Sequence, residues 1–173
     1  NKCGITAHEI DENCDSGRII EQISINILKT DSGYDILKKY EEKYLTIIQN
    51  VLKKLNDKTI SFTEQNHINA TYFGKRTPLD GHLNWNWQKE RIYNWVRSQS
   101  YPYPGAYCFD NDEKLIIDWV DFSQIGFNFD EPNGKIIKIK NNTPYVKTPN
   151  GILKITKYRS GNKKKFKLNS VLK

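Results

Sequence analysis

The second half of the chain is a series of short apolar segments separated by tight turns, and this pattern constrains the fold more than any other feature of the sequence. The segments are Tyr107–Phe109, Leu115–Trp119, Lys135–Ile139, Tyr145–Thr148 and Ile152–Lys157. Between them stand Asn-Asp, Asn-Gly, Asn-Asn and Pro-Asn-Gly sequences, whose asparagines and glycines favour tight turns because they tolerate positive φ angles. Five strands at this spacing predict a small β-barrel of the OB type.

The first third of the chain predicts a strand followed by a long helix. Ile19–Ile27 alternates isoleucine with polar residues, which is typical of a strand. Asp31 or Ser32 can cap the helix that follows, and Lys53 and Lys54 lie in its last turn, where the negative end of the helix dipole favours cations. One apolar stripe recurs at three- and four-residue steps along this helix: Leu37, Tyr40, Tyr44, Ile47 or Ile48, Val51 and Leu55.

A polar stretch and a second helix connect these two regions. Asn56–Thr71 is irregular and predicts a linker that crosses the surface. The second helix is expected to begin near Asn86 as N-cap and to bury Ile92, Trp95 and Val96. Its end is set by Ser100–Gly105, which contains two prolines. We therefore expect an α/β segment over residues 1–58, a linker over 59–80, and a helix plus an OB-like barrel over 81–173.

Composition narrows the function classes only modestly. With 27 basic and 20 acidic residues the formal charge is +7, which suggests an anionic partner: nucleic acid, a membrane surface or a phosphorylated small molecule. Part of the excess is the run Lys163–Lys165, whose simplest interpretation is a solvated tail. Three cysteines are too few for a disulfide framework, and the cysteine and histidine spacings resemble no metal site. We expect no metal and, without an apolar run or a signal peptide, a cytoplasmic protein.

One loop concentrates residues that can transfer protons. Ala7–Gly17 contains a histidine and four acids within nine positions: His8, Glu9, Asp11, Glu12 and Asp15. A carboxylate beside an imidazole can orient it and exchange protons with it. On composition alone a solvated acidic turn is the commoner outcome, so the pattern by itself leaves both interpretations open.

Three stretches, in order and at matching spacing, resemble the folate-dependent formyltransferases. The first, Cys3–Gln22, is similar to the second half of their catalytic domain: a strand, a histidine, an acid-rich loop, Asp-small-Gly, and a strand with Ile-Ile-x-Gln. The second comprises Ala70–Gly81, Leu83–Trp85, Glu90–Arg97 and Pro102–Ala106, and the third, similar to the C-terminal barrel, comprises Asn133–Ile137, Val146–Thr148 and Gly151–Ile155. The resemblance implies an α/β remnant of the catalytic domain, then a linker and the OB-like barrel.

The branch of that family is indicated by the segment Tyr72–Asp80, which reads Tyr-Phe-Gly-Lys-Arg-Thr-Pro-Leu-Asp. Sugar-nucleotide formyltransferases generally contain such a segment, and methionyl-tRNA formyltransferases generally lack it. The resemblance therefore implies transfer of a formyl group from N10-formyltetrahydrofolate to a nucleotide-linked 4-amino-4,6-dideoxysugar, preferably a dTDP-sugar, for O-antigen or a similar glycan. Two alternatives stay open: a methionyl-tRNA formyltransferase, and a non-enzymatic OB module for single-stranded nucleic acid. The acidic loop argues against the second of these, so nucleic acid is not the expected partner.

The resemblance also assigns site residues. Asp15 matches the catalytic aspartate of the family, and His8 matches a second histidine that supports the same loop. The backbone of Asp11, Glu12, Asn13 and Cys14 is expected to border the pterin of the folate. The family's Asn-x-His pair is expected before Asn1, so we predict a longer parent protein and an inactive isolated chain.

Three further residues are candidates for substrate binding. Arg76 either pairs with a phosphate or anchors the linker, and Tyr72 and Phe73 either flank a nucleotide base or pack into a core. Trp85, Trp87 and Trp95 are expected between the second helix and the barrel. The hairpins of the barrel are expected to offer a face for a homodimer, as in some sugar-formylating relatives.

Overall fold

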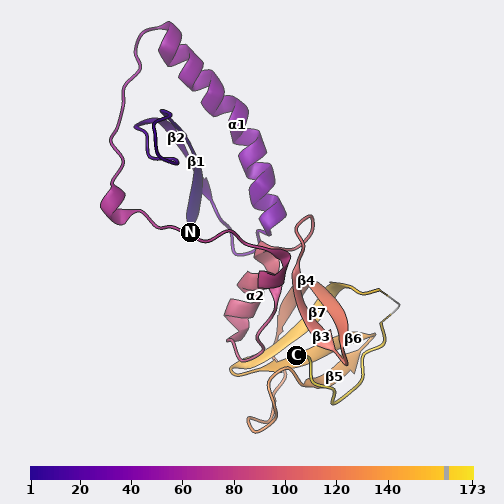
Figure 1. The fold of residues 1–173 in the computed structure, drawn as a ribbon. Helices are drawn as coiled ribbons and strands as arrows, with labels where there is room; N and C mark the ends of the chain where they lie inside the picture. Colours follow the sequence, from indigo (N-terminus) through magenta and orange to yellow (C-terminus); the bar gives the residue numbers. More distant parts are fainter. Residues whose placement is uncertain (162–163) are drawn as a thin grey trace. The chain divides into compact units, whose positions relative to one another are not determined.

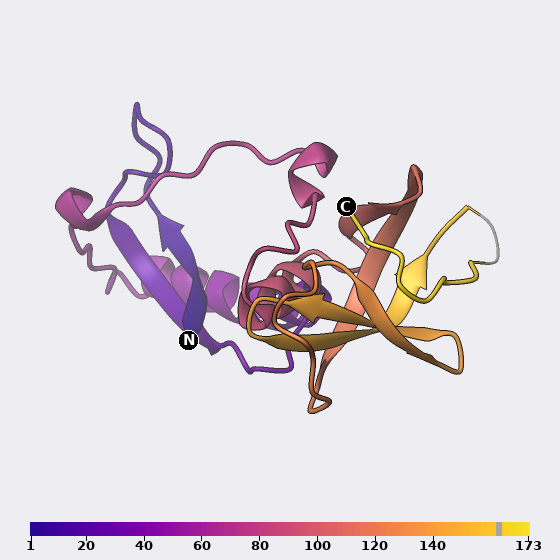
Figure 2. The ribbon, with the colours of Figure 1, turned by 90° about the horizontal axis from the view of Figure 1, so that it is seen from below.

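The computed structural model describes residues 1–161 and 164–173, which form two compact units (Figures 1 and 2). Unit 1 comprises Asn1–Asp31 and Asp35–Lys75, and unit 2 comprises Ser32–Tyr34 and Arg76–Lys173. Among the residues described, no helix combines the length and the apolar character needed to cross a bilayer.

Unit 1 is built on a two-stranded antiparallel sheet. Its strands are β1 (Lys2–His8) and β2 (Ile19–Asn26), and the pairing includes a register shift between Ala7 and His8. The strand predicted from the Ile-rich segment is therefore confirmed as β2. Its partner β1 has mostly small and polar side chains without a clear alternation, so it was expected from the family resemblance of Cys3–Gln22 and not from the residue pattern.

The long helix α1 (Gly33–Asn56) confirms the second prediction for this region, and Lys53 and Lys54 lie in its last turn. Of the predicted apolar stripe, Ile47 is buried, whereas Tyr44, Ile48 and Leu55 are about half exposed. Polar bonds add to the attachment of the helix. Lys39 binds the carboxylate of Asp31, and Lys54 binds that of Glu21 on β2. The polar stretch after α1 contains one short 3-10 turn, η1 (His67–Asn69), and one bridge to β2, between Ile19 and Thr63.

Unit 2 contains a five-stranded antiparallel sheet, and each strand lies where the sequence predicted one. The strands are β3 (Ala106–Asp110), β4 (Glu113–Ser123), β5 (Ile136–Lys140), β6 (Thr143–Thr148) and β7 (Gly151–Arg159), in the order β3-β4-β7-β6-β5. Asn111, Asp112, Asn141 and Asn142 have positive φ, as the predicted turns require. In Figure 1 the strands curve around a common interior with helix α2 beside them.

The strands described do not pair into a closed barrel, because β3 and β5 remain edges of the sheet. The C-terminal segment bonds to both of these edges instead. The backbones of Phe109 and Lys173 exchange two hydrogen bonds of 2.6 and 2.9 Å, and Ile136 N–H donates to the carbonyl of Ser170 at 2.8 Å. This segment therefore occupies both exposed edges, which leaves fewer unpaired backbone groups.

Helix α2 (Lys89–Ser98) covers the core of unit 2. The predicted start at Asn86 was wrong, because the N-cap is Gln88. The reason is a turn before the helix, in which the side chain of Asn84 accepts the Asn86 N–H at 2.9 Å. The predicted buried face is confirmed for Ile92 and Val96, which pack into one cluster with apolar residues of all five strands of the sheet. Trp85 belongs to that cluster, and Trp87 and Trp95 pack against it, as predicted.

The lysine run behaves differently from the predicted solvated tail. Lys163 lies outside the described residues, and Lys165 is exposed. Lys164, however, is only 9% exposed, and its ammonium lies 3.0 Å from Asp110 and 2.7 Å from Glu113. The prediction was wrong for Lys164 because two carboxylates at the β3–β4 turn bind it.

Candidate functional site

The acidic loop connects β1 and β2 of unit 1, and its base is held closed by several contacts. Glu9 N–H donates to the carbonyl of Arg18 at 3.0 Å, and the Arg18 guanidinium binds the Glu9 carboxylate through two bonds of 2.6 and 2.9 Å. The hydrogen bond from Arg18 lowers the pKa of Glu9. A Cβ at Gly17 would lie 2.0 Å from the carbonyl oxygen of Glu9, so only glycine fits this position.

Asp11 organises the tip of the loop. Its carboxylate accepts hydrogen bonds from Ser16 Oγ at 2.7 and 2.9 Å and from the Asn13 N–H at 3.0 Å. The bond from Ser16 is the main cause that lowers the pKa of Asp11. This aspartate is thus occupied with shaping the loop. Glu12 and Cys14 are exposed.

Asp15 and His8 are brought together by the return of the loop. His8 Nε2 lies 3.6 Å from Asp15 Oδ1, and His8 Nδ1 lies 2.7 Å from the carbonyl oxygen of Glu9. Asp15 has φ of +55°, and its side chain is 85% exposed. Gln65 donates to the carbonyl oxygens of Asp15 and Gly17 at 2.9 and 2.6 Å, which fixes the backbone while the carboxylate stays accessible. Such a carboxylate can accept a proton from a bound amine.

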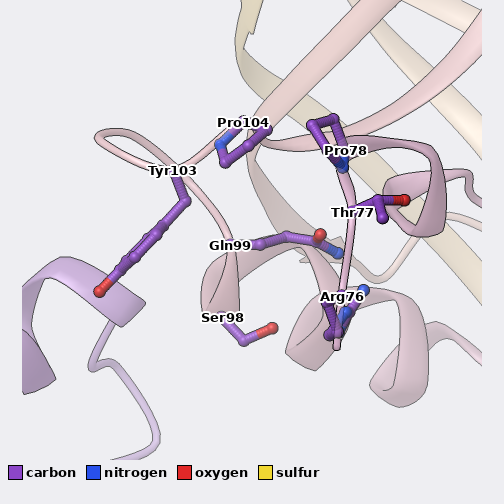
Figure 3. A pocket seen from close by; sticks show the side chains of 7 residues that line it. All are labelled: Arg76, Thr77, Pro78, Ser98, Gln99, Tyr103 and Pro104. Carbon is purple, nitrogen blue, oxygen red and sulfur yellow. The ribbon is translucent and has the colours of Figure 1, made fainter. Parts of the chain in front are cut away.

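A separate cavity of about 400 Å³ lies within unit 2 (Figure 3). Its walls are the start of η2 (Pro78–Gly81), the end of α2 and the turn before β3. The lining residues are Arg76, Thr77, Pro78, Ser98, Gln99, Tyr103 and Pro104. An aromatic ring, two prolines, a cation and short polar groups together suit a flat ring that carries an anionic group.

Arg76 is held in this cavity by two contacts. Its guanidinium carbon lies 4.4 Å from the centroid of the Trp95 ring, and Nη2 donates to the carbonyl of Asp80 at 3.1 Å. Thr77 and Asp80 form a capping box beside it, and the hydrogen bond from the Thr77 backbone is the main cause that lowers the pKa of Asp80. The stacked guanidinium keeps further N–H groups that can bind a phosphate.

The other predicted residues are placed differently. Tyr72 and Phe73 in unit 1 are almost fully exposed, so the alternative that they pack into a core was wrong. Reasoning from the sequence missed Ser98, Gln99 and Tyr103 as lining residues. Tyr103 had a signal in its Tyr-Pro-Tyr-Pro-Gly sequence, whereas Ser98 and Gln99 had none. No group of three or more histidine, cysteine or acidic side chains that could hold a metal occurs in the part of the chain that is described.

Comparison with known proteins decides the family. Residues 75–173, more than half of the chain, match the family described as formyl transferase, C-terminal domain. The chain belongs to the formyltransferase family. The resemblance drawn from the sequence is thereby confirmed.

Three solved structures share the fold. HypX from Aquifex aeolicus is 15% identical with a TM-score of 0.70, over 97% of this chain and 30% of its own. WlaRD, a sugar 3N-formyl transferase solved in the presence of dTDP and 5-N-formyl-THF, is 20% identical with a TM-score of 0.66, over 94% of this chain and 56% of its own. Methionyl-tRNA formyltransferase from Clostridium thermocellum is 20% identical with a TM-score of 0.58, over 72% of this chain and 53% of its own. The chain therefore spans 30 to 56% of the length of these three proteins.

Proposed function

We propose that the full-length protein transfers a formyl group from N10-formyltetrahydrofolate to the amine of a dTDP-linked aminodeoxysugar. Membership in the formyltransferase family supports the one-carbon transfer. The observation that carries the proposal is the accessible Asp15 carboxylate, which lies 3.6 Å from His8 in the loop where the family resemblance expects the catalytic aspartate. WlaRD, with dTDP and a formylated folate, supports the choice of co-substrates.

Asp15 is the base in this reaction, and His8 supports it. The amine nitrogen attacks the formyl carbon, and the π electrons of the formyl C=O bond move onto its oxygen. Asp15 takes a proton from the nitrogen directly or through a water. The intermediate collapses when the bond from carbon to N10 breaks, and N10 takes up a proton and leaves as tetrahydrofolate. The backbone of Asp11–Cys14 borders the pterin, and an Asn-x-His pair before Asn1 stabilises the oxyanion. The isolated chain would then be inactive.

The acceptor is bound through its nucleotide. Arg76 in the cavity of unit 2 binds a phosphate. The sequence assigns contact with the base to Tyr72 and Phe73, whose rings are exposed. The amine lies at C4 or C3 of a dideoxysugar. The family resemblance of the sequence favours an amine at C4, and the similarity to WlaRD, a sugar 3N-formyl transferase, favours an amine at C3. The reaction would take place in the cytoplasm, and the formylated sugar would later be built into a bacterial surface glycan.

The domain organisation that goes with this function has three parts. Residues 1–58 complete the catalytic domain, residues 59–80 form the linker, and residues 81–173 form a helix and an OB-like barrel whose hairpins pair two copies. The open five-stranded sheet, with the C-terminal segment bonded to both edges, supports the barrel-like part of this proposal.

The test is a formyl-transfer assay on the full-length protein with N10-formyltetrahydrofolate. Acceptors are dTDP-linked 3-amino and 4-amino dideoxysugars, and methionyl-tRNA is run in parallel. Asp15→Asn is the diagnostic variant, because asparagine keeps the shape and tolerates the φ of +55°. We expect kcat to fall by about 10² to 10⁴. Glu41→Gln, which removes an exposed carboxylate on α1, is the matched control and should keep full activity.

The outcomes separate the alternatives. Turnover of an amino-sugar nucleotide that collapses in Asp15→Asn supports the proposal. Formylation of methionyl-tRNA alone moves the protein to the other branch. Turnover unaffected by Asp15→Asn contradicts the role of the aspartate, and steeply salt-dependent binding to single-stranded RNA without turnover supports the OB module.

A further inference from the structure

Strand β4 contains a bulge that changes the direction of one acidic side chain. Ile117 pairs with Tyr158 and Trp119 pairs with Lys157, so Asp118 is the extra residue between two neighbouring positions of β7. Bulges of this kind bend a strand and re-aim a side chain, and they occur often beside functional sites.

The re-aimed Asp118 forms a two-bond ion pair with Arg159 at the end of β7. Arg159 Nε donates to Oδ2 and Nη2 donates to Oδ1, both at 2.7 Å. The Asp118 side chain is mostly buried, and that of Arg159 is partly exposed. Paired, planar hydrogen bonds between two charged groups are the strongest that side chains form and fix the geometry of both partners.

Both members of the pair also bind the turn that leads into β3. The Tyr101 N–H donates to Asp118 Oδ1 at 3.3 Å, and Arg159 Nη2 reaches the carbonyl of Pro104 at 3.5 Å. The turn is thus held at its first and last residues. Gly105 permits this approach: its φ is +94°, and a Cβ there would lie 2.8 Å from Arg159 Nη2.

This turn is one wall of the cavity that contains Arg76, because Tyr103 and Pro104 line it (Figure 3). The ring of Tyr103 packs against Gly33, but the backbone of the turn has few other bonds among the residues described. Tyr101 is largely exposed, Tyr103 is partly exposed, and one backbone bond of 3.1 Å joins Tyr103 to Ser100. Without the ion pair, the side chains of the turn would sample several positions.

We propose that Asp118 and Arg159 are positioning residues that hold the Tyr101–Pro104 turn as a wall of the cavity and so set the affinity for the nucleotide of the acceptor. The inference deepens the proposed function, since it takes that cavity as the nucleotide site. Neither residue touches the reacting atoms. Their loss therefore weakens binding of the nucleotide and leaves the chemical step largely unchanged.

The experiment compares the full-length protein with its Asp118→Asn and Arg159→Gln variants. Glu113→Gln is the matched control, because Glu113 is also ion-paired in unit 2, to Lys164 at 2.7 Å, but does not touch the turn. We expect the Tyr101 and Tyr103 amides to exchange hydrogen about tenfold faster, the Kd for dTDP to rise about five- to tenfold, and kcat to change less than about twofold. Arg159→Lys keeps the charge without the planar fork, so its Kd should lie between those of the wild type and Arg159→Gln.

Two results would overturn the proposal. Unchanged exchange of the turn in both variants would show that the pair does not hold it. Faster exchange with an unchanged Kd would show that the turn is not a wall of the nucleotide site. A wild-type protein that binds neither dTDP nor UDP refutes the proposed acceptor instead, and the exchange data still decide whether the pair holds the turn. Arg159→Lys serves as the second variant if Asp118→Asn does not fold.

Discussion

Replacing Lys164 with methionine tests whether the lysine run contributes to the fold. Methionine keeps much of the length of the side chain and removes the charge. In the native protein the ammonium lies between Asp110, which is 3% exposed, and Glu113, which is 39% exposed. Lys165, the next residue in the run, is exposed, so Lys165→Met is a matched control with the same change of charge.

The expected loss follows from the burial of each carboxylate. Removing one partner of a buried pair costs about 3–5 kcal/mol, whereas an exposed pair contributes about 0–1 kcal/mol. Asp110 belongs to the first class and Glu113 to the second. Among the residues described, Asp110 then keeps a 3.4 Å side-chain bond from Asn111 Nδ2, and water can reach it through the gap left by the ammonium. We therefore take the lower end, about 3 kcal/mol, which lowers the Tm of the transition that contains unit 2 by about 6–12 °C, at the roughly 2–4 °C per kcal/mol typical of about 150–250 cooperatively folded residues.

The pH dependence has a definite sign. Burial by itself lowers the pKa of Lys164, but the hydrogen bonds to Glu113 and Asp110 outweigh it and raise that pKa overall. A lysine with a raised pKa in the folded state contributes its full stability below the pKa of the unfolded chain, about 10.4. That contribution is lost as the pH rises through the folded value. The gap between wild type and Lys164→Met should thus be constant from about pH 7 to 9 and shrink above about pH 10.5.

Scanning calorimetry of the full-length protein measures both effects, with Lys165→Met expected within about 1 °C of wild type. Equal Tm values for Lys164→Met and Lys165→Met would refute the reasoning. A difference in Tm between wild type and Lys164→Met that grows at alkaline pH would refute the assigned pH dependence.

Three further outcomes follow from single side chains. Gly17→Ala should distort the acidic loop, because its Cβ would meet the Glu9 carbonyl, and should abolish formyl transfer while the melting of unit 2 stays unchanged. Thiol labelling followed by mass spectrometry should modify the exposed Cys14 and spare Cys108, which is buried and whose pKa burial raises to about 12. Ile92→Ala in α2 should cost about 2–5 kcal/mol in urea unfolding, because the side chain is fully buried, whereas the exposed Asn94→Ala should cost about 0.5 kcal/mol or less.

Local patterns were sufficient for most secondary structure. The five strands of unit 2 were predicted because asparagine and glycine mark their turns, and helix α1 because its apolar residues recur at helical spacing. The predicted start of α2 was wrong, because the Asn84 side chain accepts the Asn86 N–H in a turn that precedes the helix. The pairing of Asn169–Lys173 with both edges of the sheet had no local signal, because such contacts depend on segments distant in sequence.

In the candidate site, too, features with a local sequence signal were predicted and features that depend on tertiary packing were not. The acidic loop was identified by its residues and its resemblance to a family, and the structure adds the 3.6 Å approach of His8 to Asp15. The cavity of unit 2 was found only in part. Arg76 was predicted from a motif, whereas Ser98 and Gln99 line the cavity because α2 ends beside η2, which is a consequence of tertiary packing. The bulge at Asp118 was also missed, because it depends on the register in which β4 pairs with β7.

The positive charge of the chain is a weaker guide to its partner than the sequence suggested, because the fold uses many of the cations. Arg159 and Lys164 are ion-paired, and the charges of Arg91 and Lys114 lie 4.2 and 3.9 Å from the ring centroids of Trp87 and Tyr107. Such pairs hold the side chains against the protein and leave fewer free cations for a nucleic-acid backbone. Arg76 differs from these four cations because it lines a cavity. Under the proposed function, Arg76 is therefore the cation that would meet the phosphate of the acceptor.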